Sequence, residues 1–167
     1  MKKAKCIVSA VLAGAMLLPL TGCLKKVEYV KEKDFKNAIE EVFDEDDYIA
    51  HDDFIYLYDD EYSIALISYD DEDDAEDEWD DVLDSYDDMM DDNDFDGRTL
   101  RVDMPSYGYI ILNGDVDDPD FMNGRGYVYG GIYYVDDEII VVCTTRDRDS
   151  TRDDIDIILR ELGLPHP

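Results

Sequence analysis

Residues 127–145, YVYGGIYYVDDEIIVVCTT, decide the class of fold. Two runs rich in aromatic and β-branched residues, 127–135 and 138–145, flank the acidic pair Asp136-Asp137. Such residues favour strands, and a short polar break between two such runs predicts a β-hairpin.

The same pattern occurs earlier in the chain. Residues 54–58 and 62–69 are two further strand-like runs, joined by Asp59-Asp60-Glu61, and they predict a second hairpin. Between the two hairpins, residues 100–104 alternate between apolar and polar side chains, and residues 107–112 form another apolar run. We therefore expect a mainly antiparallel sheet.

Three segments carry apolar residues at helical spacing. The first has Asp34 as its N-cap, and the third begins near Ser150 and ends at Gly163, with Pro165 beyond. The three stripes are Phe35, Ala38, Ile39, Val42 and Phe43; Ala75, Trp79, Val82, Leu83, Tyr86, Met89 and Met90; and Ile155, Ile158, Leu159 and Leu162. The prediction is an α+β fold, with about three helices packed on one face of the sheet.

The two hairpins resemble each other in sequence. Residues 56–61 align with residues 133–138 in an aromatic run that ends in Asp-Asp-Glu, and a helical segment follows each hairpin. This similarity predicts two ββα units, although acidic turns recur easily in a chain with this composition.

The N-terminus has the features of a targeting segment. Lys2, Lys3 and Lys5 precede an apolar run at residues 7–20, which is short for a permanent membrane span. Leu20, Thr21, Gly22 and Cys23 then resemble the lipobox of bacterial lipoproteins.

This resemblance implies cleavage before Cys23 and transfer of a diacylglyceryl group to its sulfur. Two or more acyl chains would anchor the protein without a spanning helix. We expect the protein at the extracytoplasmic face of the cell membrane. An ordinary cleavable signal or an uncleaved anchor is the alternative.

These features divide the chain into four segments. We predict a signal peptide at residues 1–22, the lipidated cysteine and a tether at residues 23–33, an acidic domain at residues 34–164 and a tail at residues 165–167. Cys143 lies in an apolar run and is expected to be a small core residue.

The whole chain also resembles short surface lipoproteins of Gram-positive bacteria. The shared features are the lipobox, a short tether, an opening helix with a Phe-x-x-Ala-Ile stripe and a closing helix that ends in Leu-Gly. The resemblance implies no activity for any residue.

The charge of the chain is strongly negative and unevenly placed. The sequence contains 45 Asp and Glu against 15 Lys and Arg, for a formal net charge of -30. Residues 37–97 contain no Lys or Arg, whereas Lys25, Lys26, Lys31, Lys33 and Lys36 lie near the anchor. Such a surface excludes ordinary nucleic-acid binding through a basic patch. We expect the acidic block to face away from an anionic membrane, although a solvated face without a partner, or adaptation to salt, would have the same composition.

One motif points to a metal. Residues 92–97, DNDFDG, match the start of a calcium loop, in which alternate carboxylates converge on one cation and glycine allows the turn. Asp92, Asp94, Asp96 and Asp103 are the candidate ligands of a possible Ca²⁺ ion. The alternative is an acidic turn at the end of a helix.

No enzymatic motif stands out. The only histidines, His51 and His166, cannot form a His/Cys metal cluster, and no G-x-S-x-G sequence occurs. The tyrosines at 107, 109, 127, 129, 133 and 134 predict either a ligand-binding aromatic face or a half-buried sheet.

The expected function is therefore non-enzymatic. We expect a membrane-anchored acidic binding domain without catalytic residues, whose partner is a cationic peptide, a basic protein patch or divalent cations. A calcium-dependent adhesion or structural module of the cell surface is the alternative. A cell-wall hydrolase or its inhibitor has no supporting motif.

Overall fold

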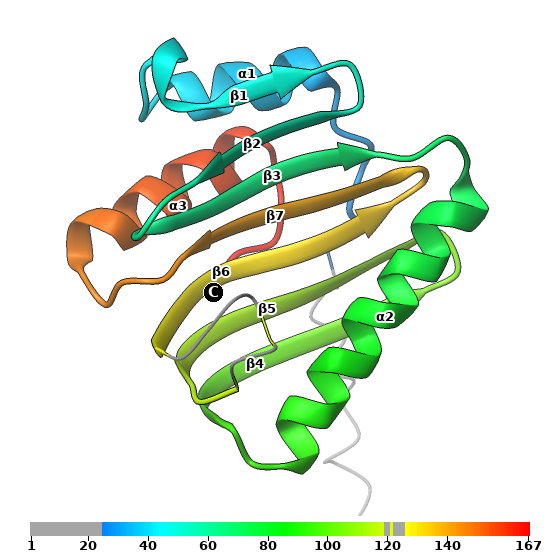
Figure 1. Cartoon of the computed structure of the whole chain (residues 1–167), viewed down its shortest axis with the longest axis vertical. Coiled ribbons are helices and arrows are strands. Elements are labelled where there is room, and N and C mark those ends of the chain that lie inside the picture. Colours follow the sequence, from blue (N-terminus) through cyan, green and yellow to red (C-terminus); the bar gives the residue numbers. More distant parts are fainter. Residues whose placement is uncertain (1–24, 119–120, 122–125) are drawn as a thin grey trace, which may run out of the picture.

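The computed structural model describes residues 25–118, 121 and 126–167. Its centre is a seven-stranded antiparallel sheet in the order β1-β2-β3-β7-β6-β5-β4 (Figure 1). The strands are β1 (Ile49–His51), β2 (Phe54–Tyr58), β3 (Tyr62–Ser68), β4 (Phe95–Met104), β5 (Tyr107–Val116), β6 (Gly126–Val135) and β7 (Glu138–Thr144). The helices are α1 (Glu32–Glu40), the short 3-10 helix η1 (Glu45–Asp47), α2 (Glu72–Asp91) and α3 (Asp149–Glu161). The α+β class predicted from the sequence is confirmed.

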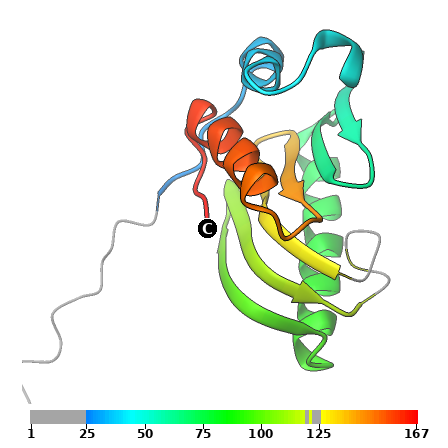
Figure 2. The same cartoon turned by 90° about the vertical axis from the view of Figure 1, so that its left-hand side faces the viewer.

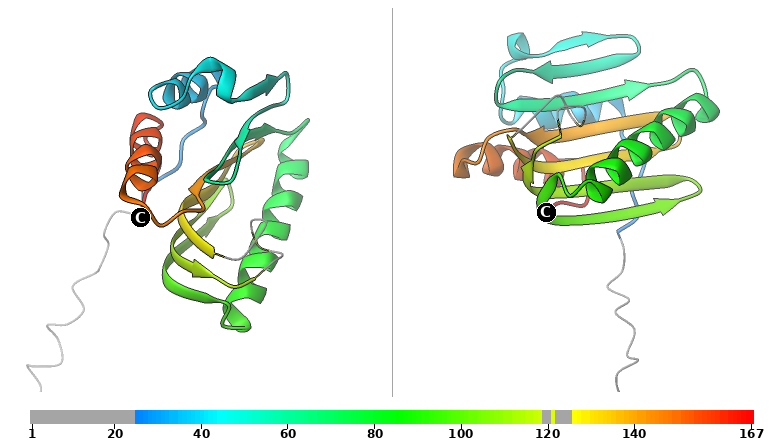
Figure 3. Two further views of the ribbon diagram at one scale, coloured as in Figure 1. Left: turned by 60° about the vertical axis from the view of Figure 1, so that its left-hand side comes forward. Right: turned by 60° about the horizontal axis from the view of Figure 1, so that its bottom comes forward.

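The helices cover both faces of the sheet, so the prediction that all three pack on one face is wrong. α1 and α3 lie on one face and α2 lies on the other (Figures 2 and 3). α2 connects β3 to β4, two strands that run in the same direction with three strands between them. Crossovers between such strands are right-handed in nearly all proteins, which restricts α2 to one face.

The same arrangement argues against two equivalent ββα units. The two hairpins β2–β3 and β6–β7 are present, and they join through antiparallel pairing of β3 with β7. A rotation about an axis perpendicular to the sheet, between β3 and β7, would superpose one hairpin on the other. Such a rotation would place the helix that follows each hairpin on the same face of the sheet. Because α2 and α3 lie on opposite faces, the prediction of a repeated unit is wrong.

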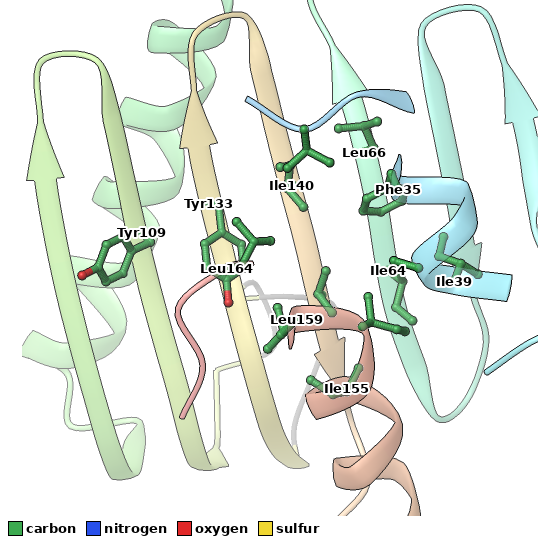
Figure 4. Close-up of a cluster of buried hydrophobic side chains, with 14 of the residues drawn as sticks. Phe35, Ile39, Ile64, Leu66, Tyr109, Tyr133, Ile140, Ile155, Leu159 and Leu164 are labelled. Atoms are coloured by element: carbon green, nitrogen blue, oxygen red, sulfur yellow. The ribbon is translucent and has the colours of Figure 1, made fainter. Parts of the chain in front are cut away.

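The first hydrophobic cluster lies between the sheet and the helices α1 and α3. Figure 4 shows Phe35 and Ile39 of α1, Ile155 and Leu159 of α3 and Tyr133 of β6, all turned toward the same layer. These five side chains have essentially no exposed surface. The stripes predicted for the first and third helices are therefore confirmed in their buried members.

The second cluster lies beneath α2. Trp79 stacks on Tyr134 with 5.9 Å between ring centroids, and the adjacent Gly108 leaves room for the indole. The buried residues of α2 are Ala75, Trp79, Leu83, Tyr86 and Met89. Like charges along α2 oppose the helix, so packing of this apolar stripe stabilises it.

The boundaries of the domain differ from those expected. Val27 and Val30 are buried in the first cluster, so residues 27–33 belong to the folded body and not to a tether. At the other end, Leu164 is buried, and the Tyr133 hydroxyl donates a hydrogen bond of 2.5 Å to the carbonyl of Pro165. The expected tail is therefore packed against the sheet as well.

Candidate functional site

α2 is strongly negatively charged. Twelve of its twenty residues are Asp or Glu, and none is Lys or Arg. The apolar stripe is turned to the sheet, so these carboxylates lie along the solvent side. Within the described part of the chain, Arg101 of β4 forms an ion pair with the helix: its guanidinium lies 2.6 Å from Asp87 Oδ1. The helix therefore presents a nearly continuous negative surface.

The side of the molecule opposite to α2 holds both ends of the described chain. Residues 25–31 run along the face that carries α1 and α3, and the C-terminus lies on the same side (Figure 2). The Lys25 ammonium donates a hydrogen bond of 3.4 Å to the carbonyl of Leu164. Lys25 and, in α1, Lys36 therefore belong to the face of the sheet opposite to α2.

α2 covers only part of the sheet face on which it packs. The second cluster draws on β5, β6 and β7, and among the described residues it takes none from β1 or β2. Figure 3 shows α2 on the part of the sheet away from β1 and β2. In β2, Ile55 and Leu57 point into the first cluster. Because side chains alternate along a strand, Phe54, Tyr56 and Tyr58 point to the α2 side.

These residues form the aromatic face of β1 and β2. The antiparallel register places His51 of β1 opposite Phe54 and Ile49 opposite Tyr56, on the same side. Tyr58 is 58% exposed, Ile49 is 47% exposed, and Tyr56 and Phe54 are 38% and 37% exposed. We define the aromatic face by these residues: Ile49, His51, Phe54, Tyr56 and Tyr58.

Carboxylates lie at both ends of the aromatic face. Exposed aspartates lie in the two turns at either end of β2: Asp52 and Asp53 before the strand, Asp59 and Asp60 after it. Asp59 Oδ1 accepts hydrogen bonds of 2.7 Å from the backbone N–H groups of Glu61 and Tyr62, which orders the second turn. The aromatic and β-branched run at residues 54–58 predicted a strand, but the sequence does not show which face of that strand a helix covers.

The predicted calcium loop is not a loop. Asp92 caps the end of α2, Asp94 follows it, and Asp96 lies in β4. Asp103 accepts a hydrogen bond of 3.3 Å from the Trp79 indole on the α2 side, whereas Asp96 lies seven residues away along the same strand and so points to the other face. The four carboxylates therefore do not converge, and the described part of the chain holds no group of three or more His, Cys, Asp or Glu side chains arranged for a metal ion.

The strand forms in place of the loop because β4 can approach β5 closely there. Gly97 pairs with Gly114, and a Cβ on Gly97 would lie 2.4 Å from the Asn113 carbonyl oxygen. Glycine at residue 97 thus allows two strands to pair closely. The calcium motif alone does not show whether its glycine lies in a turn or in a strand.

Glu138 is a buried carboxyl that sequence analysis missed. It is 1% exposed, and its Oε2 atom has no hydrogen-bond partner among the described residues. Burial, with a smaller contribution from the neighbouring Asp137, raises the pKa of Glu138 to about 7, while hydrogen bonds from Val30 and Tyr29 oppose the shift. The carboxyl therefore ties the N-terminal segment to the start of β7.

An open hollow lies near this carboxyl. It has a volume of about 810 Å³, and its lining residues are Tyr29, Asp71, Glu72, Asp73, Asp136 and Asp137. The hollow extends the negative surface of α2 around the end of the sheet, where β6 turns into β7.

The remaining candidates are mostly structural. Cys143 is fully buried, and burial raises the pKa of its thiol to about 12, so the expectation of a core residue is confirmed. Tyr109, Tyr133 and Tyr134 are buried, which confirms the half-buried sheet instead of a ligand-binding face at these strands. Among the described residues, the exposed aromatic side chains are Tyr29 and, on β2, Phe54, Tyr56 and Tyr58.

The lipobox residues Leu20, Thr21, Gly22 and Cys23 lie outside the described residues. Within residues 25–118, 121 and 126–167, no helix has the length and hydropathy needed to cross a membrane. Comparison of the chain with protein-family models, curated proteins and solved structures finds no match.

Proposed function

We propose that this chain is a non-enzymatic binding protein, anchored to the extracytoplasmic face of the membrane through a lipid on Cys23, which presents an acidic face to a cationic partner. The observation that carries the proposal is the position of α2. Apart from Glu72 and Asp73, which line the same hollow as Tyr29, its carboxylates lie on the other side of the sheet from the described end of the chain nearest to Cys23.

The distance between the anchor and the body supports this orientation. Val27 is already buried, so only residues 24–26 separate Cys23 from the packed part of the chain. Three extended residues span about 10 Å. A lipid on Cys23 would therefore hold the side of α1 and α3 close to the membrane and leave α2 facing outward.

The charge distribution favours the same orientation. Lysines close to an anionic membrane surface are attracted to the headgroups, and the lysines of residues 24–167 all lie at residues 25–36. The carboxylates of α2 are repelled by the same surface. A cationic peptide or a basic protein patch would be attracted to α2, most strongly at low salt.

Metabolic labelling of the full chain with palmitate in a bacterial host tests the anchor. We expect label on the wild type and on the control Cys143→Ala, and none on Cys23→Ala. A wild-type chain that stays unlabelled would contradict lipidation.

Binding of a fluorescent oligolysine peptide to the full chain in neutral detergent tests the acidic face. The α2 variant carries Asp77→Asn, Asp80→Asn, Asp84→Asn and Asp88→Asn, which remove four exposed carboxylates. The matched control carries Glu28→Gln, Asp34→Asn, Asp153→Asn and Glu161→Gln, which remove four exposed carboxylates outside α2. Because attraction depends on local charge, we expect the α2 variant to bind about fivefold more weakly and the control to bind nearly as wild type. Equal effects of the two variants would contradict a role for α2.

A further inference from the structure

We propose that the aromatic face of β1 and β2 is a docking site for a basic amphipathic segment of another protein. This segment would lay apolar side chains on Phe54, Tyr56 and Tyr58 and place Lys or Arg side chains over the carboxylates of the turns at both ends of β2. The inference rests on the proposed function, because it specifies where the cationic partner is held and what else that partner must contain.

The first argument is the apolar surface itself. The ring centroids of His51 and Phe54 are 4.9 Å apart, and those of Phe54 and Tyr56 are 5.6 Å apart, so the side chains form one contiguous patch. Ala65 and Ile67 of β3, which pair with Tyr56 and Phe54, extend the patch toward the sheet centre. A contiguous exposed apolar patch with polar surroundings is typical of an interaction site, and tyrosine is enriched among the residues that dominate binding.

The second argument is that the patch is preorganised. β2 is hydrogen-bonded to β1 on one side and to β3 on the other, and the alternate side chains Ile55 and Leu57 are buried in the core. The aromatic residues therefore project from a rigid support. Little conformational entropy is lost when a partner binds such a surface.

The third argument identifies the partner by its charge. Residues 37–97 contain 28 acidic residues and no Lys or Arg, and the turns at both ends of β2 contribute exposed aspartates. An anionic lipid surface or a second copy of this chain would bring like charges together at the patch. A partner that combines apolar side chains with Lys or Arg gains from both features, and its cations can also lie over the tyrosine rings.

The experiment compares two peptides on the full chain in neutral detergent, with empty micelles as the blank. One is an amphipathic lysine–leucine peptide, and the other is a lysine–glycine peptide of equal length and charge. The test variant carries Phe54→Thr, Tyr56→Thr and Tyr58→Thr, since threonine preserves strand propensity. The control carries Leu100→Thr and Met104→Thr, which remove two apolar side chains of β4 that are 47% and 46% exposed.

We expect the wild type to bind the lysine–leucine peptide at least tenfold more tightly than the lysine–glycine peptide. The triple variant should lose this difference in affinity and still bind the lysine–glycine peptide as the wild type does. The control variant should keep the difference in affinity. Tyr58→Thr alone, at the most exposed position of the face, should lose part of the difference without a change in thermal unfolding.

Three results would overturn the inference. If the triple variant keeps the preference for the lysine–leucine peptide, the aromatic face is not the docking site. Binding of the lysine–glycine peptide would then still support the acidic face of α2 as a binding surface. If neither peptide binds the wild type, the proposed function fails together with the inference. If the wild type dimerises and the triple variant does not, the face is an interface between copies of this chain.

Discussion

Gly108 is the residue on which the packing of α2 depends most visibly. A Cβ at this position would lie 2.5 Å from Cζ2 of Trp79, the largest buried side chain beneath the helix. We expect Gly108→Ala to lower the free energy of unfolding by about 1–3 kcal/mol, as overpacking does in other cores.

Denaturant unfolding of four proteins measures this coupling: the wild type, Gly108→Ala, Trp79→Phe and the double variant. Because phenylalanine lacks the indole atoms that the new methyl group would meet, the double variant should lose less stability than the two single changes added together. Strict additivity would contradict the contact.

Glu138 gives the molecule a defined dependence on pH. Its pKa is raised from an ordinary value of 4.5 to about 7, so between these two pH values the folded chain keeps a proton that the unfolded chain releases. Stability is therefore highest at the acidic end of this window and falls as the pH rises.

Urea unfolding at several pH values between 5 and 8 tests this dependence. Glu138→Gln cannot titrate, so its free energy of unfolding should fall less over this range than that of the wild type. The carboxyls of Asp136 and Asp137 and the Tyr29 hydroxyl, which face Glu138, are unchanged in the comparison. Identical pH profiles for the two proteins would contradict a buried carboxyl that titrates near neutrality.

At the scale of the element, the two ends of α2 should respond oppositely to the loss of an aspartate. Asp71 is the N-cap, and its side chain accepts a hydrogen bond of 3.1 Å from the backbone N–H of Asp74. Asp91 ends the helix, where the partial charge of the backbone carbonyls is negative and no base lies in the last turn.

We expect Asp71→Ala to lower the free energy of unfolding by about 1 kcal/mol and Asp91→Asn to raise it by a few tenths of a kcal/mol. Thermal unfolding at low ionic strength measures both. A gain in stability at both positions would mean that repulsion within α2 outweighs capping.

Elements with local signals were predicted correctly from the sequence. The hairpins followed from β-branched runs around Asp59-Asp60-Glu61 and Asp136-Asp137, and α2 followed from its stripe at helical spacing. The start of β4 was missed because residues 95–99 contain Asp, Gly and Arg and have no apolar alternation. Residues 27–30 were missed because two valines in a short segment carry no periodicity.

Features that depend on more than one element were not predictable in this way. Phe54, Tyr56 and Tyr58 differ little in composition from the buried tyrosines of β5 and β6, and only the placement of α2 over β5, β6 and β7 leaves them exposed. The acidic helix was visible from composition, whereas the sheet face that it occupies depends on the crossover from β3 to β4.

At the scale of the whole molecule, charge opposes compactness. A formal net charge of -30 over 167 residues produces self-repulsion in the folded state, which salt screens. We expect the melting temperature of the wild type to rise from low to high NaCl. The rise should be smaller in the α2 variant, in which Asp77, Asp80, Asp84 and Asp88 are replaced by Asn. A melting temperature that is flat in NaCl would contradict the dominance of repulsion.

The central proposal is that the molecule is polarised: a lipid on Cys23 would lie on one side, and the acidic face of α2, on the other side, would bind a cationic partner. Carbodiimide cross-linking of a lysine-rich peptide to the full chain, mapped by mass spectrometry, tests this claim directly because it reports which carboxylates the lysines reach. We predict cross-links concentrated on residues 72–91 of α2 and on the turns at residues 52–60, and few on the acidic residues of α3. Cross-links spread evenly over the surface, or concentrated on α3, would contradict it.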